Sequence, residues 1–127
     1  MTARIITTLL ILVGLINVFP LLGVLSAEVL ATAYNIPAPE GDLLILMRHR
    51  ALLFGVVGSI VLVSAFRRQL QPTAMVAAFV TMIGFIVLTL GSGEYGQKIY
   101  NVMLIDVFST VLLVVAALLR FRRENGP

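Results

Sequence analysis

The sequence predicts an all-α integral membrane protein: an up-and-down bundle of four transmembrane helices with a short interfacial helix between the first two spans. The prediction rests on composition, on four long apolar runs and on the placement of the basic residues. The 127-residue chain is 60% hydrophobic and 12% charged, whereas about a quarter of the residues in a soluble domain are charged. A domain this small cannot bury such an apolar excess in its own core. Lipid is therefore the expected solvent for much of its surface.

Four apolar runs are long enough to cross a bilayer, which takes about 20 helical residues. We expect spans at residues 5–25, 43–66, 72–90 and 99–119, within a single domain that comprises residues 1–127. The second and third spans are separated only by residues 67–71, and Pro72 suits the first turn of a helix. Residues 91–98 join the third and fourth spans. Links this short favour antiparallel neighbours.

The first connection is longer and has helix signals of its own. Ser26 is a good N-cap, Glu28 falls in the first turn, and Pro37 and Pro39 follow. These residues predict an interfacial helix at about residues 27–34. Within the first span, Pro20 should interrupt the helical hydrogen bonds and produce a kink.

The arginines predict the orientation of the chain in the membrane. If the chain crosses four times, six of them fall on one side: Arg4, Arg67, Arg68, Arg120, Arg122 and Arg123. The other side carries Glu28, Glu40, Asp42 and Glu94 with Lys98. The positive-inside rule then places both termini in the cytoplasm. A secretory signal ending near Ala31-Thr32-Ala33 is the competing interpretation, but the first apolar run is longer than a signal core of about 7 to 15 residues.

Several classes of function are excluded by composition. The chain has no cysteine and only one histidine, His49, so thiol chemistry is absent and neither a metal site nor a cofactor is expected. The basic residues flank apolar runs and are topology signals, so we expect no nucleic-acid partner. The expected partners are the lipid bilayer and a membrane protein or a second copy of the chain.

Ionisable residues inside two of the spans are the candidate functional site. Arg48, His49 and Arg50 lie in the second span, and Asp106 lies in the fourth. Such groups cost about 2.5 to 3.5 kcal/mol each at a helix centre on insertion scales, so they need partners or water. At about 1.5 Å per residue, the two arginines and Asp106 fall at nearly one depth, roughly 8 to 10 Å from the non-cytoplasmic boundary.

The depths predict an ion pair between the second and fourth spans. Arg48 is the preferred partner of Asp106, because it shares a helix face with Ala51, Gly55 and Gly58, and small residues mark close helix contacts in membranes. Arg50 shares its face with bulkier residues and is the second choice.

Polar residues of the other spans extend this cluster into a predicted pocket in the non-cytoplasmic half of the bundle. Asn17 in the first span falls at a similar depth, as do Thr81 and Gly84 in the third. Further polar residues lie near the expected pocket mouth: Glu94, Tyr100 and Asn101. The cytoplasmic half contains no ionisable side chain, so no charged path is expected across the membrane.

The leading hypothesis for function is a non-enzymatic membrane protein, either an accessory subunit or a binder of a small polar, anionic or lipid ligand in this pocket. The alternative is a membrane enzyme acting on a lipophilic substrate, with His49 and Asp106 as acid and base. A purely structural ion pair is the third interpretation.

The segment from Leu46 to Gly55, which contains Arg48-His49-Arg50, together with Asn17 and Asp106, resembles a group of uncharacterised small bacterial membrane proteins. That group is broadly similar to the DoxX-like four-helix proteins. The resemblance covers nearly the whole chain and implies a four-helix bundle in the bacterial inner membrane. Some members carry the name phosphopantetheine adenylyltransferase. That enzyme needs a His-x-Gly-His motif and alternating strands and helices, so the single His49 of this chain excludes the activity.

Overall fold

The computed structural model describes residues 1–127 and is all-helical. Its α-helices are α1 (Thr2–Val18), α2 (Ala27–Tyr34), α3 (Gly41–Phe66), α4 (Gln71–Ser92) and α5 (Gln97–Asn125), with 3-10 turns at η1 (Phe19–Val24) and η2 (Arg68–Leu70). Four segments are long and apolar enough to cross a membrane: Thr2–Val24, Gly41–Phe66, Arg68–Ser92 and Gln97–Asn125. The predicted helical bundle with four apolar spans is thereby confirmed, and it indicates a multi-pass membrane protein.

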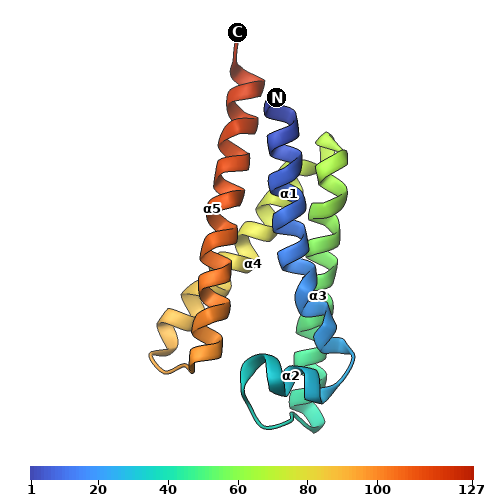
Figure 1. The fold of residues 1–127 in the computed structure, drawn as a ribbon, viewed down its shortest axis with the longest axis vertical. Helices are drawn as coiled ribbons and strands as arrows, with labels where there is room; N and C mark the ends of the chain where they lie inside the picture. Colours follow the sequence, from blue (N-terminus) through green and yellow to red (C-terminus); the bar gives the residue numbers. More distant parts are fainter.

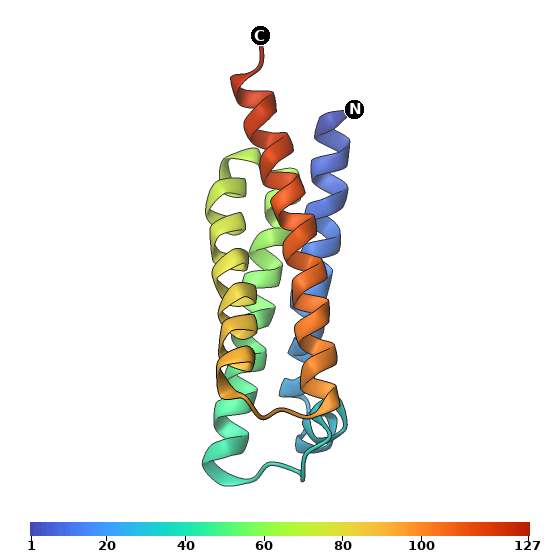
Figure 2. The same cartoon turned by 90° about the vertical axis from the view of Figure 1, so that its left-hand side faces the viewer.

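The four long segments run up and down, and both termini lie at the same end (Figure 1). Around the bundle, α1 packs on α3 and α5, and α4 packs on α3 and α5. Consequently α3 and α5 occupy opposite corners, with α1 and α4 between them. Figure 2 shows α5 in front of the bundle, beside α1 and α4.

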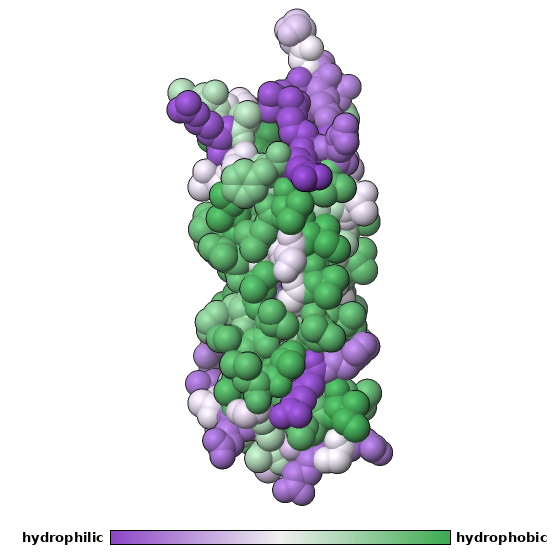
Figure 3. All heavy atoms as spheres, turned by 90° about the vertical axis from the view of Figure 1, so that its right-hand side faces the viewer, coloured by the Kyte–Doolittle hydropathy of each residue, from purple (hydrophilic) through white to green (hydrophobic).

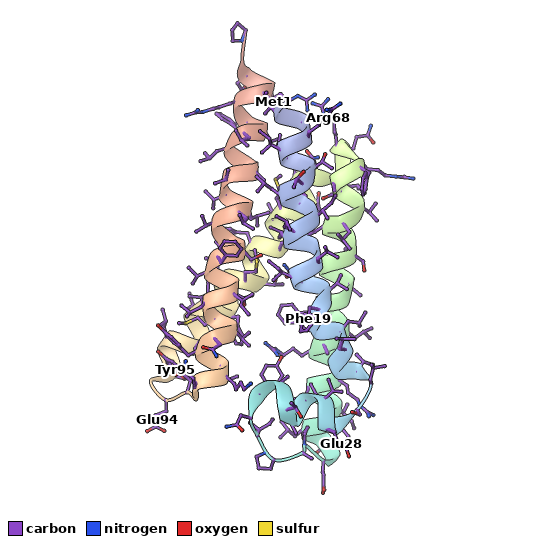
Figure 4. The ribbon with its side chains drawn as sticks, viewed as in Figure 1. Met1, Phe19, Glu28, Arg68, Glu94 and Tyr95 are labelled. Carbon is purple, nitrogen blue, oxygen red and sulfur yellow. The ribbon has the colours of Figure 1, made fainter.

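Charge divides the two ends of the bundle. The basic end carries Arg4, Arg67, Arg68, Arg120, Arg122 and Arg123, and the acidic end carries Glu28, Glu40, Asp42 and Glu94. Figure 4 shows Met1 and Arg68 at one end and Glu28 and Glu94 at the other. Between the ends runs a hydrophobic belt (Figure 3), in which large apolar side chains such as Phe66 and Leu88 are 75% exposed. Exposure on this scale is what a lipid-facing surface requires.

The core occupies the middle of the bundle and its basic half. It consists of apolar side chains from all four long segments: Ile6, Leu10, Val13, Val61, Ala65, Ala74, Met75, Ala78, Met82, Leu113 and Ala116.

Small residues set the close contact between α1 and α3. A Cβ atom on Gly58 would lie 2.6 Å from the backbone nitrogen of Val18, and one on Gly14 would lie 2.7 Å from the side chain of Leu62. The predicted role of the small-residue face of the second span is confirmed. Its partner, however, is the first span.

The interfacial helix has the predicted bounds, and its N-cap is the predicted one: the backbone N–H of Val29 donates to Ser26 Oγ at 3.2 Å. Asn35 ends it in the left-handed conformation, with φ of 52°. The expected break at Pro20 takes the form of a change from α-helix to 3-10 helix after Val18, because proline removes a backbone donor.

Candidate functional site

A cleft of about 350 Å³ lies between α3 and α4. In Figure 1, α4 begins beside α3 at the basic end and crosses behind α1 toward α5 at the acidic end, so α3 and α4 diverge. Gly84 of α4 has no atom within 4 Å of the place a Cβ would occupy. The cleft is lined by Leu46, His49, Arg50, Leu53, Phe54 and Val57 of α3 and by Val80, Thr81, Gly84, Phe85 and Leu88 of α4.

Aromatic rings hold the guanidinium of Arg50 within this cleft. Arg50 Cζ lies 5.0 Å from the ring centroid of Phe54, 5.1 Å from that of Phe85 and 5.5 Å from that of Tyr34. Arg50 Nη1 also donates a hydrogen bond of 2.7 Å to the Tyr34 hydroxyl. Cation–π contacts are stronger where water is excluded. These contacts come from α2, α3 and α4 and fix the arginine in one place.

Most of the hydrogen-bonding capacity of Arg50 is unused. A guanidinium presents a planar fork of several N–H donors, and the bond to Tyr34 is the only one that Arg50 makes within the chain. Among its neighbours in the cleft, His49 is exposed, and Thr81 donates its hydroxyl to the Ala78 carbonyl at 2.9 Å. The cleft therefore presents free cationic donors in an otherwise apolar lining, an arrangement suited to an anionic oxygen.

The predicted ion pair between Arg48 and Asp106 is wrong. The only salt bridge in the structure joins Arg120 and Glu124 on α5. Arg48 shares the small-residue face of α3, and this face packs on α1 and η1: Leu21 covers Gly55, and Val18 covers Gly58. The Arg48 Nε atom is buried without a hydrogen-bond partner. The small residues did mark a close helix contact, but the helix that makes this contact carries no acidic residue.

Asp106 lies on α5, across the bundle from α3, and is 9% exposed. Its backbone carbonyl accepts a hydrogen bond from Thr110 Oγ1, and no hydrogen bond joins its side chain to His49. Arg50 lies nine residues after the start of α3 at Gly41, and Asp106 lies nine residues after the start of α5 at Gln97.

Asn17 is placed in the interior of the bundle and does not line the cleft. It is 3% exposed, and its amide donates to the Val13 carbonyl at 2.9 Å and contacts Met82 Sδ at 3.7 Å. This contact joins α1 to α4 across the bundle. Asn17 therefore belongs to the packing between these two helices.

The residues expected at the pocket mouth lie at the turn between α4 and α5. Glu94 is exposed, Tyr100 stacks on Tyr95 with centroids 6.2 Å apart, and Asn101 accepts a hydrogen bond from Gln97. None of the three expected residues lines the cleft. The divergence of α4 from α3 carries this turn away from α3 (Figure 1).

The sequence-based prediction missed the aromatic residues around Arg50. Phe54 follows Arg50 by one helical turn, a spacing that brings side chains together, so this contact had a signal in the sequence. Tyr34 and Phe85 approach Arg50 only through tertiary packing. No three His, Cys, Asp or Glu side chains gather anywhere in the structure to hold a metal ion.

Comparison with known proteins found no family model, no curated protein and no solved structure that matches this chain.

Proposed function

We propose that this chain is a small multi-pass membrane protein that binds a polar or anionic ligand in the cleft between α3 and α4. The observation that carries the proposal is Arg50, a fixed guanidinium with free donors in a lipid-facing cleft. An ionisable residue at membrane depth marks a functional site by default. Without a ligand, the free donors of Arg50 would remain partly desolvated, which costs free energy.

The proposed setting is the bacterial inner membrane, with both termini in the cytoplasm. The arginines of the basic end favour this orientation by the positive-inside rule. The cleft then lies in the non-cytoplasmic half. We also propose membership of the DoxX-like group, on the Arg48-His49-Arg50 segment with Asn17 and Asp106. Because the chain lacks native cysteine, single cysteines at Thr2 and Glu94 would test the orientation by labelling with a membrane-impermeant maleimide. Glu94→Cys should react from outside intact cells, and Thr2→Cys should not.

A binding role is favoured over catalysis. An acid–base pair needs its two groups within reach of one substrate, but His49 lines the cleft on α3 and Asp106 is buried on α5. The one hydroxyl in the cleft lining belongs to Thr81, and it donates to the Ala78 carbonyl and not to His49. An accessory subunit that holds a ligand for a larger membrane complex is compatible with the same site.

The test uses the absence of tryptophan from the chain. In Phe85→Trp, the indole is the sole tryptophan and keeps a ring beside Arg50, since tryptophan is the best cation–π partner. Bromobenzoate, a small anionic quencher, should then quench the fluorescence saturably in phosphatidylcholine nanodiscs, whereas neutral bromobenzamide should not.

The second substitution tests the role of Arg50. Adding Arg50→Gln should weaken quenching by bromobenzoate about tenfold or more, because hydrogen bonds to charged groups contribute about 1.5 to 3 kcal/mol. The matched control is Arg67→Gln, which removes an exposed arginine at the basic end and should leave quenching unchanged. Equal quenching in all three proteins would exclude an anion site at Arg50.

A further inference from the structure

The shape and polarity of the cleft point to the class of ligand. We infer that the cleft binds a single-chain amphiphile with an anionic oxygen headgroup, which enters sideways from the lipid; this inference rests on the proposed function. The headgroup chemistry is that of a carboxylate or a phosphate.

The cleft opens on the side of the bundle. Four of its lining side chains belong to the lipid-facing surface: Leu46 is 65% exposed, Leu53 50%, Val80 63% and Leu88 75%. The cleft lies between two adjacent helices, and no residue of α1 or α5 lines it. A ligand can therefore reach Arg50 from the bilayer without passing through the core.

Polarity changes along the length of the cleft. On α3, the lining extends from Leu46 to Val57, a rise of about 16 Å along the helix axis. The ionisable residues, His49 and Arg50, lie toward the acidic end, while Leu53, Val57 and Val80 line the deeper part. An amphiphile in the same orientation as a lipid of the adjacent leaflet would place its headgroup at Arg50 and its chain along the deeper part.

The environment of Arg50 selects the headgroup. The ring centroids of Phe54, Phe85 and Tyr34 all lie within 5.5 Å of Arg50 Cζ, and the one hydrogen bond to Tyr34 leaves the other N–H donors of the guanidinium free. This planar fork matches the paired oxygens of a carboxylate or phosphate.

The volume of the cleft limits the hydrophobic part to one chain. A group the size of a water molecule occupies about 30 Å³ in a liquid, so about 350 Å³ holds about a dozen such groups. This number suits a single acyl chain of moderate length, and a second chain would have to lie outside the cleft, in the lipid.

The experiment places one tryptophan at each end of the cleft. Phe85→Trp reports on the headgroup end and Val80→Trp on the deeper end, and Val107→Trp on α5 reports quenching from bulk lipid. The probe is decanoic acid dibrominated at mid-chain, added to phosphatidylcholine nanodiscs. We expect saturable quenching of the two cleft reporters and only linear quenching of Val107→Trp. A second probe, with the same brominated alkyl chain and a phosphate headgroup, tests the other source of an anionic oxygen. Saturation with either headgroup supports the inference, and saturation with neither overturns it.

Controls separate this inference from the proposed function. The dibrominated alcohol of the same chain length should bind about tenfold more weakly or worse, as should the acid in Arg50→Gln. Gly84→Leu should block the acyl chain, because Gly84 lines the cleft and a Cβ there would meet no atom within 4 Å, so the added side chain points into open space. Gly91→Leu, at an equally open position outside the cleft lining, is its matched control and should bind normally.

Two outcomes would overturn the single-chain inference. In the first, brominated phosphatidylglycerol, which has two chains, saturates the cleft reporters as well as the fatty acid does. In the second, bromobenzoate quenches Phe85→Trp but the brominated chain never saturates Val80→Trp. The second outcome would leave the proposed anion site at Arg50 intact, so the two failures are distinguishable.

Discussion

The side chain of Arg50 donates to the hydroxyl of Tyr34 at 2.7 Å, and this bond ties the interfacial α2 to the middle of the acidic half of α3. The two residues are 16 positions apart and lie on either side of the loop that contains Pro37 and Pro39. Since α2 has only eight residues, it is too short to be stable alone. Its position therefore depends on such contacts.

Tyr34→Phe should loosen α2 and leave the cation–π contact in place. The aromatic ring stays, while the hydrogen bond from the charged donor is lost. Such a bond contributes about 1.5 kcal/mol or more to stability. We expect about tenfold faster amide hydrogen exchange across α2. Tyr95→Phe is the control, because Tyr95 contacts Tyr100 through its ring. Unchanged exchange in Tyr34→Phe would mean that the bond does not hold α2.

Ser26→Ala should also release α2, this time from its N-terminus. The Ser26 hydroxyl accepts the backbone N–H of Val29, and loss of such a cap costs about 1 kcal/mol. Faster exchange is expected in the first turn of α2 and not in α3. Thr8→Ala removes an exposed hydroxyl that donates only to the Arg4 carbonyl and should have no effect on α2. Equal exchange in both variants would contradict the capping role.

Gly58→Ala should destabilise the packing of α1 on α3. The added Cβ would lie 2.5 Å from Val18 Cγ2 and 2.6 Å from the Val18 backbone nitrogen, and a backbone atom cannot move aside as a side-chain end can. Overpacking costs about 1 to 3 kcal/mol. Unfolding in mixed micelles with increasing dodecyl sulfate would measure the loss. Gly91→Ala meets no atom within 4 Å and should keep or slightly raise the free energy of unfolding. A Gly58→Ala protein as stable as Gly91→Ala would contradict the close contact.

The extent of sequence-based prediction differs between the fold and the site. The four long apolar helices, the short helix α2 and its Ser26 cap follow from local signals, namely apolar length and capping chemistry, and they are present as predicted. The partner of Arg48 depends on which helices are neighbours around the bundle. In an up-and-down bundle whose consecutive helices are neighbours, the second and fourth spans are diagonal in either handedness. Because α3 and α5 are diagonal in the structure as well, an equal expected depth was not enough to pair Arg48 with Asp106.

A double-mutant cycle would test this correction directly. With no ion pair between them, Arg48→Ala and Asp106→Ala should have additive effects on the free energy of unfolding, to within about 0.5 kcal/mol. Rescue of Asp106→Arg by Arg48→Asp would instead support the ion pair and contradict the helix order.

Asn17→Leu tests whether Asn17 belongs to the ligand site or only to the packing between helices. Asn17 and leucine are similar in size, and the amide donates only to Val13 of its own helix and to the sulfur of Met82, a weak acceptor. Replacing it with an apolar group of similar shape should therefore change the free energy of unfolding by no more than about 1 kcal/mol. In a Phe85→Trp background, quenching by bromobenzoate should be unchanged, because Asn17 does not line the cleft. If Asn17→Leu weakened quenching about as much as Arg50→Gln, the ligand site would have to extend to Asn17. The helix packing that separates Asn17 from the cleft would then have to change when the ligand binds.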